Sequence, residues 1–193
     1  MKKMIAIALV LCLTLTGCMG QGMISPPETL SDGTPWDSAW VNMAGRVGVQ
    51  TPEGFELLTT NGTLEDMTIH YATWVVGEGT EVEKNTYIYE AQVYLMTELC
   101  ASAQEAEQTK AEWYGQFGDT LQITARETLT VEEAELELLY YDCTGADTHF
   151  TRGVCAIWRH EDMVLVADIA HADTLQLDLT KTVTDFLTGF HYV

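Results

Sequence analysis

Alternation of apolar and polar positions predicts a β-rich domain between about residues 36 and 193. Two long β-rich runs span residues 67–76 and 86–96. In the second run, alternate residues from Tyr87 to Leu95 are aromatic or aliphatic, which places them on one face of a strand. Residues 77–85 are expected to link the two runs.

A four-stranded meander is predicted in the second half of the chain. Its strands are expected near residues 121–129, 135–143, 153–160 and 163–170. Glu161-Asp162 forms the turn between the last two strands. Both faces of these strands carry apolar side chains, for example Trp158 and Leu165 on one face and Ile157 and Val166 on the other. An antiparallel sheet usually leaves one face in water, so this sheet is expected to be covered on both sides.

Capping residues and helical spacing predict two helices. Ser102 and Glu105 form a Ser-x-x-Glu capping box, and Gly118 is expected to end this first helix. A terminal amphipathic helix is expected to begin at the capping residue Asp173 and to end at Gly189. The predicted fold class is therefore α+β, with an antiparallel sheet of about six or seven strands sandwiched by helices.

The start of the domain is predicted to be a hairpin. Residues 46–50 have strand character, and Pro52 and Gly54 supply a turn before the next strand. This hairpin and the helices are the elements expected to cover the two faces of the sheet.

The first 35 residues predict export rather than a packed core. Lys2 and Lys3 precede an apolar run of signal-peptide length, which is too short for a spanning helix. The sequence Leu15-Thr16-Gly17-Cys18 resembles the bacterial lipobox, in which the cysteine receives a diacylglyceryl group and becomes the first residue. Residues 1–17 are thus a predicted lipoprotein signal peptide. Residues 18–35, rich in Gly, Pro, Ser and Thr, are a predicted tether before a single domain at 36–193.

Charge narrows the range of partners. The 193 residues include 29 Asp and Glu against 9 Lys and Arg, a formal net charge of −20. Binding to a phosphate backbone depends on Lys and Arg, so no nucleic-acid partner is expected. The acidic clusters at 78–83, 105–107 and 132–133 are interpreted as solubilising surface, because they lack the spacing of an EF-hand.

Three cysteines would remain after cleavage and acylation of Cys18: Cys100, Cys143 and Cys155. Cys143 and Cys155 lie symmetrically about His149, so a hairpin centred there would make them face each other. They are either a disulfide or two small buried side chains, and the sequence leaves both alternatives open. Cys100 is expected to pack at the entrance of the first helix.

Two sets of residues are candidates for chemistry. His149 and His171 could meet at one end of the meander near Asp147 and Asp173, a ligand set that would suit zinc or a similar ion. The alternative is solvated histidines and capping aspartates.

Asp168 is predicted to share a row with Cys143 and Cys155. It is either an acid with a raised pKa or a structural carboxylate paired with Arg126 or Arg159. The common catalytic motifs Gly-x-Ser-x-Gly, Cys-x-x-Cys and His-Glu-x-x-His are absent from the sequence.

The order of elements resembles the PsbP-like fold over about residues 40–193. The resemblance rests on the turn Pro52-Glu53-Gly54-Phe55, a helix containing Trp113, the meander, and a final helix ending Phe186-Leu187-x-x-Phe190. It implies an antiparallel sheet between helices, as in photosystem II extrinsic proteins, a small nuclear-transport regulator and many bacterial lipoproteins of unknown role. It also implies a binding or assembly module, without naming a ligand or transferring a functional residue.

The sequence therefore predicts a lipid-anchored, extracytoplasmic, non-enzymatic binding or envelope-assembly module. Its expected partners are the bacterial membrane, through the diacylglyceryl group on Cys18, and an envelope protein that would cover exposed aromatic residues near Trp36 and Trp40. No cofactor is expected. The alternatives are a metal-binding lipoprotein that uses His149 and His171, or an exported enzyme that uses scattered residues such as Asp168 and His171.

Overall fold

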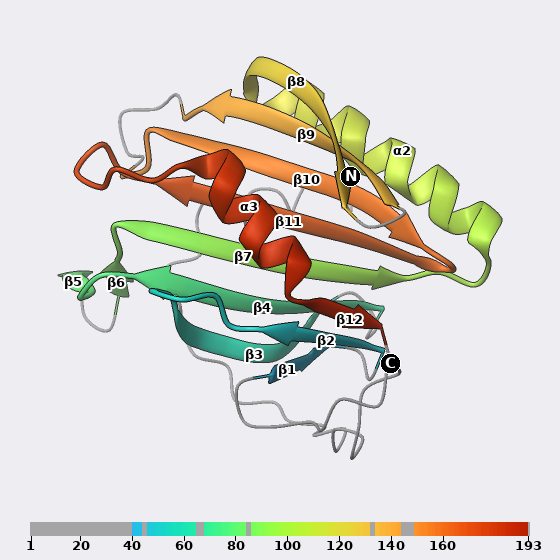
Figure 1. Cartoon of the computed structure of the whole chain (residues 1–193), viewed down its shortest axis with the longest axis horizontal. Helices are drawn as coiled ribbons and strands as arrows, with labels where there is room; N and C mark the ends of the chain where they lie inside the picture. The colour runs from blue at the N-terminus through green and yellow to red at the C-terminus, as the bar shows by residue number, and fades with distance from the viewer. Residues whose placement is uncertain are drawn as a thin grey trace.

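The computed structural model describes residues 40–43, 46–64, 68–83, 86–131, 134–143 and 149–192 (Figure 1). The predicted signal peptide, the tether and Cys18 lie outside the described residues, as do Trp36 and the side chain of Trp40. Among the helices that are described, none is both long and apolar enough to span a membrane.

A seven-stranded sheet forms the centre of the domain, with all neighbouring strands antiparallel. Its strand order is β3-β4-β7-β11-β10-β9-β8. The strands are β3 (Glu56–Leu64), β4 (Ile69–Val76), β7 (Ala91–Leu99), β8 (Gln122–Val131), β9 (Ala134–Asp142), β10 (Arg152–His160) and β11 (Met163–His171). The predicted meander is confirmed by β8 to β11, which are neighbours in chain order.

Both faces of this sheet are apolar and both are covered, as predicted (Figure 1). Helix α2 (Ala103–Thr120) lies on one face, where Trp113 and Phe117 pack in a cluster with Ile157. Helix α3 (Leu179–Thr188) lies on the other face. There the rings of Phe186 and Trp74 pack edge to face, with their centroids 4.9 Å apart. The predicted α+β fold, a sheet between helices, is confirmed.

A second, three-stranded sheet shares the α3 side of the molecule. It consists of β1 (Trp40–Met43), β2 (Val47–Gln50) and β12 (Phe190–Tyr192), with β2 in the middle. Val47 and Val49 of β2 are fully buried in the same core cluster as Phe186. This small sheet and α3 together form the covering layer.

The predicted N-terminal hairpin is wrong in its pairing. The turn itself is present, because Gly54 has φ 84° and the Phe55 N–H donates to the Pro52 carbonyl at 3.2 Å. However, β2 pairs with β1 and β12, whereas β3 pairs with β4. The turn carries the chain from the small sheet to the large one, since burial of Val47 and Val49 holds β2 in the covering layer.

Both helices differ from prediction at one end. Helix α2 continues past Gly118 to Thr120, and the Leu121 N–H closes it on the Phe117 carbonyl at 2.9 Å. Helix α3 begins after Asp178 rather than Asp173, because the Asp178 carboxylate accepts the Lys181 N–H at 2.9 Å. The chain then leaves α3 at Gly189, as predicted, and enters β12, a strand that the sequence did not predict.

The segment predicted as a linker contains a strand. β5 (Thr80–Glu83) pairs with β6 (Thr86–Ile88) in a separate two-stranded sheet, seen at the left of Figure 1. The predicted run 86–96 is therefore divided into β6 and β7. Val82 and Tyr87 on this hairpin are exposed.

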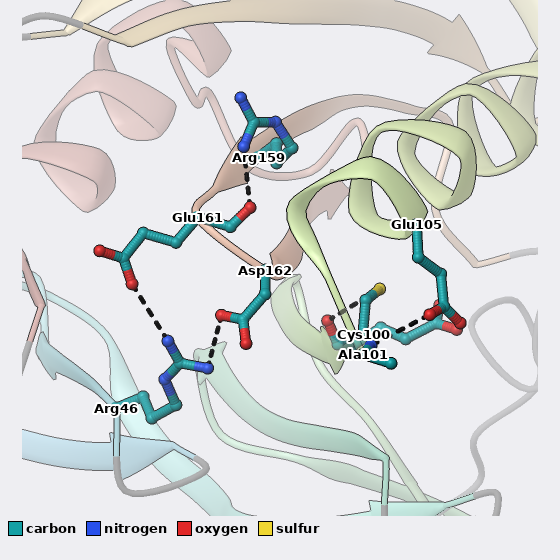
Figure 2. A network of polar contacts seen from close by, with 8 residues as sticks. Arg46, Cys100, Ala101, Glu105, Arg159, Glu161 and Asp162 are labelled. Atoms are coloured by element: carbon teal, nitrogen blue, oxygen red, sulfur yellow. Dashed lines mark hydrogen bonds and ion pairs between the residues drawn. The ribbon is translucent and has the colours of Figure 1, made fainter.

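The turn between β10 and β11 is tied to the small sheet by charge (Figure 2). The Arg46 guanidinium contacts the Glu161 carboxylate at 3.2 Å and the Asp162 carboxylate at 2.6 Å. Arg159 donates to the Glu161 carbonyl at 2.8 Å, and Glu161 has φ 50°. These contacts fix the turn between Glu161 and Asp162 against the residue that precedes β2.

Helix α2 begins with the predicted cap. The Ser102 hydroxyl accepts the Glu105 N–H at 3.2 Å. The Glu105 carboxylate in turn accepts the Ala101 N–H at 3.1 Å (Figure 2). Cys100 packs beside this helix start, as predicted, with its Sγ 3.7 Å from the Thr109 hydroxyl.

Replacing Ser102 with Ala is expected to lower the free energy of unfolding by about 1 kcal/mol, because the Glu105 N–H loses its acceptor. Urea unfolding measures the loss. The matched control is Gln104→Ala, which alters an exposed side chain in the same turn and should change stability by only a few tenths of a kcal/mol. Equal effects of the two substitutions would contradict a capping role for Ser102.

Candidate functional site

The two cysteines predicted to face each other do not. Cys155 on β10 pairs with Leu139, four residues before Cys143, and the Cys143 N–H donates to the Thr151 carbonyl at 2.9 Å. Cys143 and Cys155 are free thiols. Burial raises the pKa of Cys143 to about 11 and that of Cys155 well above its usual range, with Asp168 adding to both shifts. Neither thiol is activated as a nucleophile.

Asp168 is a buried carboxyl group on the α2 face of the sheet. It lies opposite Cys155 on β10, as predicted, and opposite Tyr94 on β7. Its Oδ1 accepts a hydrogen bond from the Tyr141 hydroxyl at 2.6 Å. The predicted arginine partners are wrong: Arg126 donates to Tyr114, and Arg159 pairs with Glu107.

A glycine allows Tyr141 to reach Asp168 across an intervening strand. Tyr141 belongs to β9 and Asp168 to β11, with β10 between them. Gly153 of β10 pairs with Tyr141, and a Cβ at Gly153 would lie 2.5 Å from the Tyr141 hydroxyl oxygen. The phenol therefore crosses β10 in the space that Gly153 leaves open.

Burial makes the Asp168 carboxyl a weaker acid. Desolvation raises its pKa from 3.8 to about 6, and the hydrogen bond from Tyr141 opposes this shift only in part. Desolvation and the nearby Asp168 also raise the pKa of Tyr141 well above its usual range. The prediction of a raised pKa at Asp168 agrees with its surroundings. Because only 8% of Asp168 is exposed, the group lies inside the core rather than in an open site.

The two predicted histidines occupy different settings. His149 is exposed, and its predicted neighbour Asp147 lies outside the described residues. His171 is 5% exposed, with Nδ1 2.9 Å from the Ala172 carbonyl oxygen. No group of three or more His, Cys, Asp or Glu side chains suited to a metal ion occurs among the described residues, so the metal site stays a prediction.

Asp168 and His171 do not share a site. They are three positions apart on β11, so their side chains project from opposite faces of the sheet. Asp168 lies beside Cys155 in the cluster under α2, whereas His171 lies beside the start of α3. An active site that combines these two residues is therefore excluded.

The structure places His171 in a pocket that the sequence did not predict. This pocket, of about 360 Å³, lies where the ends of β10 and β11 meet the connection into α3. Its lining consists of Arg152, His171, Asp173, Leu175, Gln176, Leu177, Leu179 and Thr180. His171 is its buried part, while Arg152, Asp173, Gln176 and Thr180 are exposed at its rim.

The rim carries charges of both signs in a fixed arrangement. Arg152 of β10 is the cross-strand neighbour of His171 on β11. The Nη2 atom of Arg152 lies 3.7 Å from Oδ1 of Asp173. Thr151 donates from its hydroxyl to the same Asp173 oxygen at 2.7 Å. The hydroxyl groups of Thr180 and Tyr140 are 2.8 Å apart. Asp173 therefore holds a position on the rim instead of capping a helix.

The first turn of α3 forms part of the wall of this pocket. The N–H groups at the start of a helix have no acceptor within the helix. Asp178 satisfies the N–H of Lys181, and Leu179 and Thr180 are the two helical residues before it, both in the pocket lining. Sequence reasoning missed Arg152 and Thr180 as pocket residues, because no local signal shows that they approach residues 171–176.

No protein-family model and no curated protein match the sequence. Among solved structures, the chain is similar to the solution structure of cyanobacterial PsbP (CyanoP) from Synechocystis sp. PCC 6803. The match has a TM-score of 0.46 and 9% sequence identity, and it covers 92% of this chain and 100% of that chain.

Proposed function

We propose that this protein is a lipid-anchored, extracytoplasmic, non-enzymatic binding module, and that the pocket beside α3 is its ligand site. The observation that carries the proposal is the pocket itself, a hollow of about 360 Å³ with a charged rim and a buried histidine. Ligand sites are typically hollows of this size with a few polar groups that converge on the ligand.

The distribution of perturbed groups supports binding rather than catalysis. Asp168, Tyr141 and Cys155, whose pKa values are raised by burial, lie on the α2 face. The pocket lies on the α3 side of the sheet. Catalytic acids and bases usually occupy the cleft that holds the substrate, and here these three groups are separated from the pocket by the sheet. Tyr140 does lie beside the pocket, with its hydroxyl 2.8 Å from that of Thr180, but burial raises its pKa and so makes it a weaker acid.

The lipid anchor rests on the sequence. Cys18 ends the lipobox-like Leu15-Thr16-Gly17-Cys18, and the Gly-, Pro- and Ser-rich stretch to residue 35 precedes the first described strand. An acidic domain is repelled by anionic lipids, so a tether between the anchor and the domain serves to hold it away from the membrane surface.

Intact mass spectrometry of the chain purified from a bacterial membrane tests the anchor. A polypeptide that begins at Cys18 and carries a diacylglyceryl group is expected, because the lipobox directs acylation and cleavage there. Cys18→Ala should abolish the lipid and the membrane association, whereas the control Cys12→Ala, in the cleaved segment, should leave both unchanged. A wild-type chain without lipid on Cys18 would overturn the anchor.

Crosslinking in the same membranes distinguishes a module that binds a small ligand from one that assembles with an envelope protein. Small-ligand binding predicts a chain without a recurrent protein neighbour. Repeated crosslinks to a single envelope complex would instead support an assembly role, in which the partner surface rather than the pocket carries the function.

A further inference from the structure

The charges around the pocket restrict the kind of ligand that it can hold. Arg152 would attract an anion, but Asp173, only 3.7 Å away, would repel it. A simple cation meets the opposite problem. A ligand with one charge of each sign avoids both penalties, because each of its charges can lie beside the oppositely charged group.

The spacing of the two rim charges matches a small zwitterion. In an α-amino acid, the ammonium and carboxylate groups are attached to the same carbon, so they lie a few ångströms apart. Arg152 Nη2 and Asp173 Oδ1 are separated by a similar distance, 3.7 Å. Their side chains are 58% and 69% exposed, so a ligand can reach both without displacing packed groups.

The position of Asp173 and the apolar part of a ligand have further support from the surrounding chain. Asp173 is held by the Thr151 hydroxyl, which orients its carboxylate at the rim. The half-buried side chains of Leu175 and Leu177 supply an apolar wall for the rest of the ligand.

We propose that the pocket binds a free α-amino acid or a similarly small zwitterion. Its carboxylate pairs with Arg152, and its ammonium group pairs with Asp173. The volume of about 360 Å³ is ample for a single amino acid. This inference rests on the proposed function, since it names the ligand class for the same pocket.

Matched probes test the inference on the full mature lipoprotein in detergent. Isothermal titration is carried out with L-alanine, L-serine, L-leucine and L-glutamine, and then with the N-acetyl and methyl ester forms of the tightest binder. The N-acetyl form lacks the ammonium group and the ester lacks the carboxylate. Each derivative is expected to bind at least about ten-fold more weakly than the parent, because one charged contact is lost.

Two substitutions assign the charges to residues. Arg152→Gln should weaken binding of the parent about ten-fold and remove its advantage over the methyl ester. Asp173→Asn should make the parent amino acid bind no more tightly than its N-acetyl form. The control substitutions Arg126→Gln on β8 and Asp119→Asn on α2 make the same charge changes outside the pocket and should leave all affinities unchanged.

The outcomes distinguish this inference from the function on which it rests. If a derivative with a single charge binds as tightly as the parent amino acid, and Arg152→Gln or Asp173→Asn weakens that binding, the pocket is a ligand site but not for zwitterions. If none of the probes binds, the zwitterion inference is wrong. If native mass spectrometry of the membrane-purified protein also shows no retained small molecule, the proposed ligand-binding function fails with it.

Discussion

Replacing Asp168 with Asn is expected to stabilise the domain at pH 7 by about 2 kcal/mol. The carboxyl group has a pKa of about 6 in the folded state, against 3.8 for the free side chain. Between these values the folded state binds more protons than the unfolded state. The contribution of Asp168 to stability is therefore full below pH 4 and is lost as the pH rises through 6. Asn keeps an oxygen that can accept the hydrogen bond from the Tyr141 hydroxyl. Because Asn carries no charge, the loss of stability at high pH does not occur in the variant.

Urea unfolding of both proteins at pH 4, 5, 6, 7 and 8 measures this effect. The difference in unfolding free energy, variant minus wild type, should rise between about pH 4 and pH 7 and then become constant. Asp119→Asn is the control, because Asp119 is exposed on α2. Tyr141→Phe provides the opposite test, because it removes the hydrogen-bond donor to Asp168. Burial of the Asp168 carboxylate should then cost more free energy, so stability at pH 8 should fall. A difference between Asp168→Asn and wild type that does not vary with pH would show that Asp168 is not titrating in this range.

Replacing Gly153 with Ala is expected to destabilise the domain by about 3 kcal/mol or more. The added Cβ would lie 2.5 Å from the Tyr141 ring and 2.6 Å from the backbone carbonyl oxygen of Ile169. The carbonyl oxygen belongs to the sheet and cannot move freely, and the ring can move only by leaving Asp168. The substitution thus combines overpacking with loss of the 2.6 Å hydrogen bond.

A second glycine supplies the control for this substitution. Gly115 lies in α2, and a Cβ there would meet no atom within 4 Å. Gly115→Ala is therefore expected to stabilise the protein by up to about 1 kcal/mol, because Ala favours a helix more than Gly does. Opposite signs for the two substitutions in thermal or urea unfolding support the proposed packing of Tyr141. A Gly153→Ala protein as stable as wild type would contradict it.

The fold was predictable from the sequence where the signals are local. The period-two pattern and the short turn at Glu161-Asp162 determine the meander, and Ser102 with Glu105 determines the start of α2. The errors occur where pairing depends on distant residues. The strands on either side of the turn at Pro52 join different sheets, and no local signal predicts this. Burial of Val49 in the same core cluster as α3 determines the sheet that β2 joins.

The candidate site was less accessible than the fold for the same reason. Strand register places Asp168 opposite Cys155, and period-two reasoning predicts this. The contact with Tyr141 requires in addition that Gly153 be recognised as a gap in the intervening strand. The pocket depends on how the connection after His171 folds back to α3, which begins five residues later than the capping residue Asp173 suggested.

The position of the last strand determines when the domain can finish folding. β12 occupies residues 190–192 and pairs with β2 at 47–50, and the Gln50 N–H donates to the Gly189 carbonyl at 3.0 Å. β2 therefore acquires its second neighbour only after all the other described strands and helices have been made. Contacts so distant in sequence slow folding. If the chain is exported as proposed, late closure of this sheet keeps the polypeptide open for longer during translocation, and removal of β12 would leave one edge of β2 unpaired.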